Sequence, residues 1–283
     1  QYHNDNGLTV FGDFSYSWDG FKQKRHYSES FKENPDSDKS FTTLSDESAK
    51  RRGQSLTTDG GINYDFGKNS IGMKYIFSRT PRSKFISKGY TLSNATCISD
   101  ITSSTAFSTQ SFDHYINTFG DFSIPMDMKL RVDLDYLSGK TATRWNATEK
   151  ETDKAITNHN KSTHDYIGAK LKIDKNFNNI EIEAGVEYAH TVNNQDFTSA
   201  GGSEEFLKPA TDKVSQNLWA YFLSFDYDIT PMWNIYGGLR YEATDSRYVQ
   251  NGIYESNLSQ KYNDFLPNLG VQFKSPVNIT MYY

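Results

Sequence analysis

Hydrophobic and polar residues alternate along much of the chain with a period of two. In residues 128–136 every even position is apolar or aromatic, whereas the odd positions are Lys129, Arg131, Asp133 and Asp135. Residues 180–188 repeat the pattern, with acidic side chains at Glu181, Glu183 and Glu187. A helix would mix the two sets around its circumference, but a β-strand points them to opposite faces. Both segments are therefore predicted to be strands with one apolar and one charged face.

The same alternation predicts a series of further strands. It is clear in the segments 8–18, 71–77, 167–173, 219–227, 233–241 and 265–273. Weaker matches cover 56–66 and 116–124, and a last strand begins at Ile279 and runs to Tyr283. About ten or eleven strands are expected by this criterion. The predicted fold class is all-β, with an antiparallel sheet.

The predicted connections are of two kinds. Tight turns are expected at Gly67–Asn69, Ile124–Asp127, Asp174–Asn179, Asp228–Met232 and Ser275–Val277. They alternate with long polar stretches that are expected to be loops, at 31–50, 143–162, 194–213 and 245–260. Short turns at one end and long loops at the other are typical of outer-membrane barrels, whose turns face the periplasm.

Hydropathy and aromatic content fit strands that cross a membrane. The mean hydropathy is -0.72, and no apolar run reaches the ~18 residues that a membrane-spanning helix requires. A membrane strand needs only every second residue to be apolar, so a polar composition does not oppose this interpretation. The 19 Tyr, 19 Phe and 4 Trp gather near the predicted strand ends, as in the aromatic girdles of barrels. A transmembrane β-barrel that contacts membrane lipid and lipopolysaccharide is the predicted architecture.

Charge and cysteine content exclude other classes. The net charge is -5 and no basic stripe is present, so no nucleic-acid partner is expected. Cys97 is the single cysteine and forms no internal disulfide. Gln1 is not followed by a charged and then an apolar region, so any export signal is expected to lie upstream or to have been removed.

Several segments resemble the β-barrel domain of TonB-dependent outer-membrane receptors. The most specific are Tyr236–Thr244, which reads YGGLRYEAT, and Tyr262–Phe273, which reads YNDFLPNLGVQF; Phe77–Pro81 and Trp219–Phe222 add weaker support. The resemblance implies a barrel of about 22 strands closed around an N-terminal plug. It also implies an inner-membrane energy-coupling protein and an extracellular nutrient as partners.

Neither a plug nor a coupling segment is recognised, and ten or eleven strands cannot close so large a barrel. Residues 1–283 are therefore expected to be a partial barrel domain, with Tyr283 as the C-terminal aromatic of a complete small barrel as the alternative.

The six histidines do not form a recognisable catalytic or metal-binding motif, and no cofactor or metal site is assigned. His159 and His164 are expected in or beside a long loop, where irregularly spaced histidines are usually solvated. Asp113–His114 and His164–Asp165 contain an acid and a base. Neighbouring residues of a strand point to opposite faces, so neither pair forms a catalytic dyad by itself. The protein is not expected to be an enzyme.

The charged faces of the predicted strands are the candidate site. Nine residues are expected to point into the lumen: Lys129, Arg131, Asp133, Asp135, Glu181, Glu183, Glu187, Arg240 and Glu242. The resemblance implies that they contact a plug, and the alternative is that they only keep a wide lumen hydrated. Arg240 is the expected anchor, since Glu242 lies on the same face and a guanidinium grips carboxylates. The expected function is energy-coupled uptake of an extracellular nutrient of unidentified class. A passive porin-like or adhesion barrel is the alternative, followed by a soluble β-sandwich binding module.

Overall fold

The structure is a computed structural model that describes residues 1–4, 6–32, 40–93, 99–149, 154–201, 208–274 and 280–282. These residues form one 13-stranded sheet, and none of them is helical. Within them, no helix of the length and apolar character of a membrane span is found. The strands are β1 (Tyr2–His3), β2 (Leu8–Lys32), β3 (Ser40–Phe66), β4 (Asn69–Ser93), β5 (Ser99–Ile124), β6 (Met128–Glu149), β7 (Lys154–Phe177), β8 (Ile180–Ala200), β9 (Ala210–Asp228), β10 (Trp233–Gln250), β11 (Ile253–Tyr254), β12 (Gln260–Lys274) and β13 (Thr280–Tyr282).

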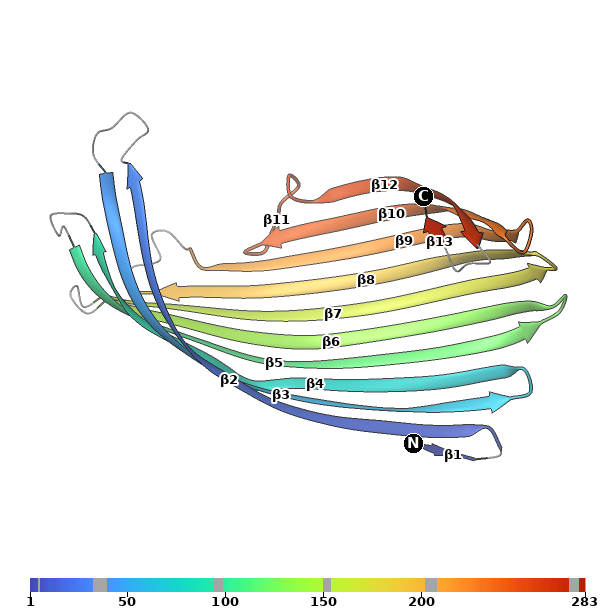
Figure 1. Cartoon of the computed structure of the whole chain (residues 1–283), viewed down its shortest axis with the longest axis horizontal. Helices are drawn as coiled ribbons and strands as arrows, with labels where there is room; N and C mark the ends of the chain where they lie inside the picture. Colours follow the sequence, from blue (N-terminus) through green and yellow to red (C-terminus); the bar gives the residue numbers. More distant parts are fainter. Residues whose placement is uncertain are drawn as a thin grey trace.

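The strands follow one another around the sheet in chain order. Every pairing is antiparallel, and β11 alone leaves the path by pairing only with β10. Figure 1 shows the result as a curved sheet with β1 and β2 at one edge and β12 and β13 at the other. No pairing joins these two edges among the described residues, so the sheet is open there. The predicted all-β antiparallel fold is confirmed, and its ten long strands span 15 to 27 residues.

The register gives the sheet one apolar and one polar face, because residues directly opposite each other in an antiparallel pair share a face. One row across six strands is entirely apolar or aromatic, and it consists of Val132, Leu171, Val186, Tyr221, Tyr241 and Phe265. The row one residue further along lies on the other face and consists of Asp133, Lys170, Glu187, Ala220, Glu242 and Asp264. We refer to these as the apolar face and the polar face.

The sheet has almost no core of its own. Among the described residues only Ala49 and Ala220 are buried hydrophobics, and no large side chain is fully buried. Leu223 on the apolar face is 57% exposed and Leu269 is 73% exposed. A soluble β-sandwich would cover such a face with a second sheet, whereas the described residues form only one. The sandwich alternative is therefore wrong.

The strands are much longer than the sequence predicts. β2 has 25 residues, which at ~3.3 Å per residue is about 80 Å, whereas an apolar band of ~25 Å needs only ~9–11 residues. The strands therefore extend well beyond the apolar band, as Figure 1 shows at the end away from the tight turns. Most described residues of the four predicted long loops belong to these extensions, so the prediction of loops there is wrong.

The loop at 245–260 contains an overlooked hairpin. Asn251 and Gly252 both have positive φ angles, of 49° and 82°, and connect β10 to β11. An Asn-Gly pair is the usual sequence of such a two-residue turn. At the other end of the sheet, Gly67 has a φ of 63° in the two-residue turn before β4. The predicted turn at Ser275–Val277 and residues Cys97, Ile279 and Tyr283 lie outside the described residues.

A bulge in β4 changes which of its residues face which side. The register against β5 shifts between Thr80 and Ser83, and the register against β3 shifts at the same level. Pro81 lies in this interval and has no N–H to donate, which interrupts the ladder. Arg79 pairs with Leu56 on the apolar face, and beyond the bulge Lys84 pairs with Arg52 on that same face.

Candidate functional site

All nine candidate residues lie on the polar face. The register connects β6 to β10 across the sheet. Asp133 is opposite Lys170, Glu187 is opposite Ala220, and Ala220 is in turn opposite Glu242. The alternation within each strand places the remaining candidates on the same side. The structure thus brings together charges from three predicted strands and adds Lys170, Lys172 and Asp174 from β7, which the sequence reasoning missed.

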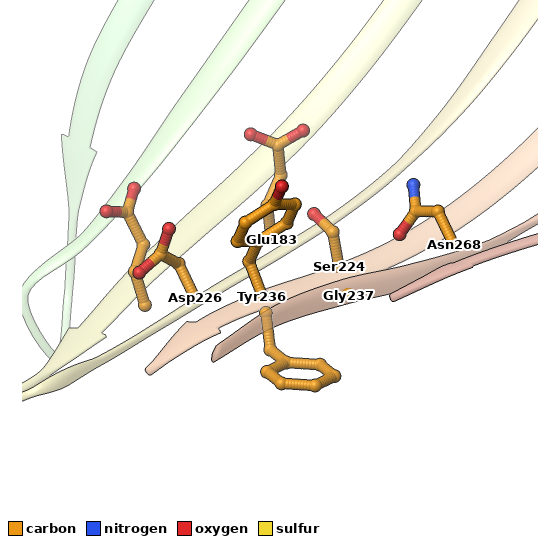
Figure 2. A pocket seen from close by; sticks show the side chains of 8 residues that line it. Glu183, Ser224, Asp226, Tyr236, Gly237 and Asn268 are labelled. Atoms are coloured by element: carbon orange, nitrogen blue, oxygen red, sulfur yellow. The ribbon is translucent and has the colours of Figure 1, made fainter. Parts of the chain in front are cut away.

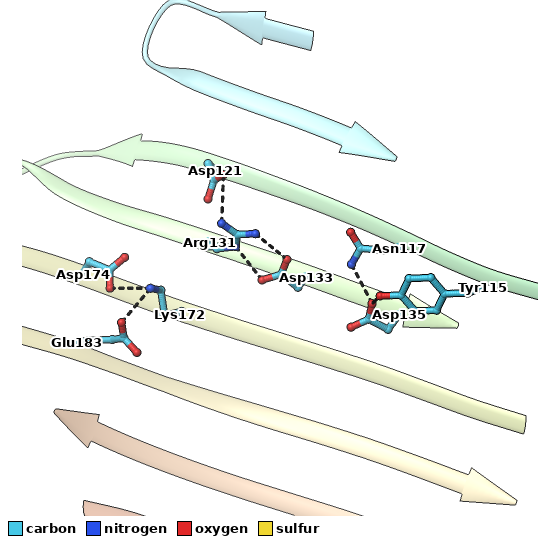
Figure 3. Close-up of polar contacts among 9 residues, drawn as sticks. All are labelled: Tyr115, Asn117, Asp121, Arg131, Asp133, Asp135, Lys172, Asp174 and Glu183. Carbon is cyan, nitrogen blue, oxygen red and sulfur yellow. Dashed lines mark hydrogen bonds and ion pairs between the residues drawn. The ribbon is translucent and has the colours of Figure 1, made fainter. Parts of the chain in front are cut away.

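The first cluster on the polar face is centred on Arg131 (Figure 3). Its Nε donates to Asp133 Oδ2 at 2.9 Å, and its second terminal nitrogen donates to Asp133 Oδ1 at 3.3 Å. Its other terminal nitrogen lies 3.7 Å from Asp121 Oδ2 on β5. The guanidinium therefore engages one carboxylate with two nitrogens and a second carboxylate across the strand pair.

The second cluster is centred on Lys172 of β7. Its ammonium donates to Glu183 Oε2 on β8 at 2.8 Å and lies 3.3 Å from Asp174 Oδ1 (Figure 3). Asp174 stands at the end of β7 that precedes a tight turn, so this cluster lies near the turns. The alternation of Lys170, Lys172 and Asp174 with apolar neighbours was a usable signal for these residues.

The third cluster is centred on Arg240, which the sequence analysis predicts to be the anchor for a plug. Its Nε donates to Glu242 Oε1 at 2.6 Å, and one terminal nitrogen donates to Glu187 Oε2 at 3.0 Å. Arg240 therefore bridges two carboxylates, one of them two strands away, instead of gripping one with both nitrogens. Ala220 stands between Glu187 and Glu242 in the register and is fully buried, so its small side chain leaves room for this bridge.

The remaining candidates differ in their partners. Asp135 accepts hydrogen bonds from the Tyr115 hydroxyl at 2.6 Å and from Asn117 Nδ2 at 2.8 Å. Lys129 and Glu181 form no ion pair with any described residue. Glu181 instead lines a pocket of about 340 Å³ together with Glu183, Ser224, Asp226, Tyr236 and Asn268 (Figure 2).

This pocket lies on the polar face near the tight-turn end of β8, β9 and β10. Figure 2 shows Glu183, Ser224, Asp226 and Tyr236 projecting to one side of the sheet. The Tyr236 ring occupies the space beside Gly270 that a side chain there would fill. Asn234 is buried and donates to the carboxylates of Asp226 and Asp228. The pocket therefore offers carboxylates, a phenol and amides to a polar or cationic surface.

The histidines are arranged differently from the sequence expectation. His159 and His164 lie on β7, five residues apart, and therefore point to opposite faces and cannot chelate one ion together. Asp113 of β5 and His164 of β7 meet across Gly139, with His164 Nε2 3.1 Å from Asp113 Oδ1. Sequence reasoning missed this pair because it forms across strands. Among the described residues, no group of three potential metal ligands is found.

The fold and the two faces define an antiparallel β-barrel protein of the bacterial outer membrane. Residues 125–283 match the outer membrane protein beta-barrel family, and because they make up more than half of the 283 residues, the chain belongs to that family. No curated protein matches the sequence.

Solved structures of outer-membrane receptors are similar to the chain at low identity. The chain is similar to the ferric preacinetobactin receptor of Acinetobacter baumannii, with 10% identity and a TM-score of 0.53 over 100% of this chain and 47% of that chain. It is also similar to the ferripyoverdine receptor of Pseudomonas aeruginosa, with 11% identity and a TM-score of 0.49 over 93% of this chain and 40% of that one. It therefore spans less than half the length of either receptor.

The Escherichia coli outer membrane protease OmpT is a third similar structure, with 14% identity over 96% of this chain and 98% of that one. Its TM-score of 0.27 carries no argument for or against a shared activity.

Proposed function

We propose that the chain is part of a larger outer-membrane receptor barrel that takes up an extracellular nutrient with energy from the inner membrane. The observation that carries the proposal is the polar face, where Arg131, Lys172 and Arg240 each hold two carboxylates. Such a surface is ordered and charged, as a wall against a polar plug must be. The resemblance of Tyr236–Thr244 and Tyr262–Phe273 to TonB-dependent receptors supports the same function.

The open edges support a barrel that has more strands than the sheet described here. Among the described residues, the outer edge of β2 pairs only with the two residues of β1, and the outer edge of β12 pairs only with the three residues of β13. In a membrane every backbone N–H and C=O group needs a partner, so a spanning sheet must close on itself. Residues 1–283 are accordingly proposed to be one portion of the barrel domain.

The acidic pocket is the proposed contact for the plug. Glu181 forms no ion pair with a described residue, and Glu183 and Asp226 lie beside it in the same hollow. A partly buried carboxylate is stabilised when a cation or donor approaches it. A plug surface with Arg, Lys or backbone N–H groups would supply that partner. Arg240 is proposed to act as a positioning residue for the wall beside the pocket.

Bilayer conductance of the full-length protein separates this proposal from a passive porin, without knowledge of the nutrient. A plugged receptor is expected to show no steady conductance, and deletion of the plug is expected to open it. Arg240→Ala is expected to give intermittent openings while the protein still inserts. Arg247→Ala is the matched control, because Arg247 lies on the same strand but on the opposite face and is 61% exposed. Steady porin-like conductance of the unaltered protein would contradict the proposal.

A further inference from the structure

Four cations gather on the apolar face of β2, β3 and β4, directly beyond Trp18. In the register Trp18 is opposite Gln54, Gly20 is opposite Arg52, and Lys22 is opposite Lys50. Arg52 is in turn opposite Lys84 of β4. Lys22, Lys50, Arg52 and Lys84 therefore share one face within a few residues of Trp18, and we call them the cationic cluster.

The bulge at Pro81 is what adds β4 to this cluster. Without the extra residue, alternation from Arg79 would put Lys84 on the polar face. With it, Lys84 stands opposite Arg52 on the apolar face. Gly20 has no side chain to cover Arg52 from the neighbouring strand, and an added Cβ there would meet only a backbone oxygen. The local backbone thus opens the cluster instead of covering it.

The described part of the chain provides no counter-charge to the cluster. None of the four cations forms an ion pair with a described residue, and Lys22, Lys50 and Arg52 are exposed. The two acids closest in sequence both point to the polar face, where Asp19 lies 3.5 Å from Arg51 and Glu47 lies 3.9 Å from Arg25. Two hollows of about 390 and 270 Å³ adjoin the cluster, and Trp18 and Arg52 line both. Four like charges held this close favour binding of an anion.

The other half of the sheet shows a contrasting arrangement on the same face. On β10 and β12, the Asp245 carboxylate lies 3.0 Å from the Lys261 ammonium and 3.6 Å from the Arg247 guanidinium. These charges largely neutralise one another on the apolar face. The cationic cluster differs in this respect from β10 and β12, although further cations without an ion pair to a described residue lie on the same face, among them Arg144 of β6 and Lys161 of β7.

We propose that the cationic cluster binds the phosphorylated glucosamine headgroup of lipopolysaccharide in the outer leaflet. Trp18 marks the edge of the apolar band, the level at which aromatic girdles meet lipid headgroups. Below it Phe14 and Tyr16 are 69% and 56% exposed on the same face and can contact acyl chains. Arg52 can engage a phosphate with two nitrogens, and the lysines add point charges. This inference rests on the orientation in the proposed function, with the tight turns in the periplasm.

Native mass spectrometry of the full-length protein in detergent tests the inference, with diphosphorylated lipid A as the probe. We expect Lys22→Glu/Arg52→Glu/Lys84→Glu to weaken binding by at least ~100-fold, since each cation near an anionic surface contributes about a factor of five or more. Lys213→Glu is the matched control, because Lys213 is exposed on the apolar face of β9, away from the cluster. It is expected to bind lipid A as the unaltered protein does.

Three outcomes would overturn the inference. Equal affinity of the triple variant and the unaltered protein would show that the cluster is not the site. Undiminished binding of dephosphorylated lipid A would remove the role of phosphate. Full competition by inorganic phosphate, or equal binding of phosphatidylglycerol, would assign the cluster to a different anion.

Cysteine labelling on intact cells tests the orientation separately, in a Cys97→Ser background that removes the native thiol. In this background Ser256→Cys is expected to react with an impermeant maleimide and Lys68→Cys to remain unlabelled. Reversal of this pattern would overturn the orientation and, with it, the lipopolysaccharide inference. The uptake proposal would be unaffected, because the conductance measurement tests it separately.

Discussion

Two adjacent rows of the sheet show how strongly the two faces differ. The row from Val132 to Phe265 on the apolar face contains no charge, and the row from Asp133 to Asp264 on the polar face contains five. Both rows use the same strands at the same height and have the same hydrogen-bonded backbone. The environment of a residue is therefore decided by its parity along the strand, and the effect of a substitution should follow parity more than residue type.

The two faces are also stabilised in different ways. Large apolar side chains such as Leu223 and Phe265 are 57% and 67% exposed, so their contribution depends on lipid around the barrel. On the polar face the charges are stabilised by neighbours within the sheet, as in the bridge from Arg240 to Glu187 and Glu242. A test of either face therefore has its matched control one residue away.

The largest expected effect comes from a charge placed on the apolar face. Leu223→Arg should lower the free energy of unfolding of the full-length protein by ~2–4 kcal/mol, the cost of Arg facing the membrane midplane. Ser224→Arg should be close to neutral, because its neighbours in the pocket are Glu181, Glu183 and Asp226. Urea titration in phospholipid vesicles measures both variants. Similar losses in the two would remove the distinction between the faces.

A smaller effect is expected when the central cation of the polar face is removed. Arg240→Ala leaves the half-buried Glu187 and Glu242 without their shared partner, which should cost ~1–3 kcal/mol. Adding Glu187→Gln to Arg240→Ala should recover part of this loss, because one unpaired charge is then gone. The same urea titration reports the two variants, and no recovery in the double variant would show that the bridge is not the cause.

The smallest effect is expected at Arg131, whose side chain is 45% exposed. Arg131→Lys keeps the charge and loses the two-nitrogen contact with Asp133. Exposed ion pairs contribute little, so the change in unfolding free energy should be at most ~0.5 kcal/mol. A loss of stability as large as that of Arg240→Ala would mean that the contribution of an ion pair on the polar face does not depend on its exposure.

The alternation of residues sufficed to predict the strands wherever the two faces meet different surroundings. Residues 128–136 and 180–188 were assigned correctly because lipid selects one parity and water the other. The extensions of β2 and β3 carry no such signal, since water reaches both sides there. Their polar sequences look like loops, although β2 and β3 stay paired from Lys32 and Ser40 inward.

The face of each candidate site residue followed from parity, but the partners did not. Arg240 and Glu242 lie two apart on one strand, so their contact could be anticipated. Lys172 with Glu183, and Asp113 with His164, form only once the register between strands is fixed. The bulge at Pro81 also depends on the pairing between strands. Its one inserted residue moves Lys84 to the other face. Register depends on the whole sheet and is not encoded by any single strand.

A spin-label scan of β9 from Trp219 to Tyr227 tests the central claim most directly, because β9 is paired on both sides. Each position is labelled in turn in the full-length protein in vesicles, with Cys97→Ser removing the native thiol, and accessibility to oxygen and to a water-soluble nickel complex is measured. The account predicts that the odd positions are accessible to oxygen and that the even positions are accessible to nickel, or protected from both by a plug. Accessibility that does not alternate with a period of two, or nickel access at Tyr221 and Leu223, would contradict it.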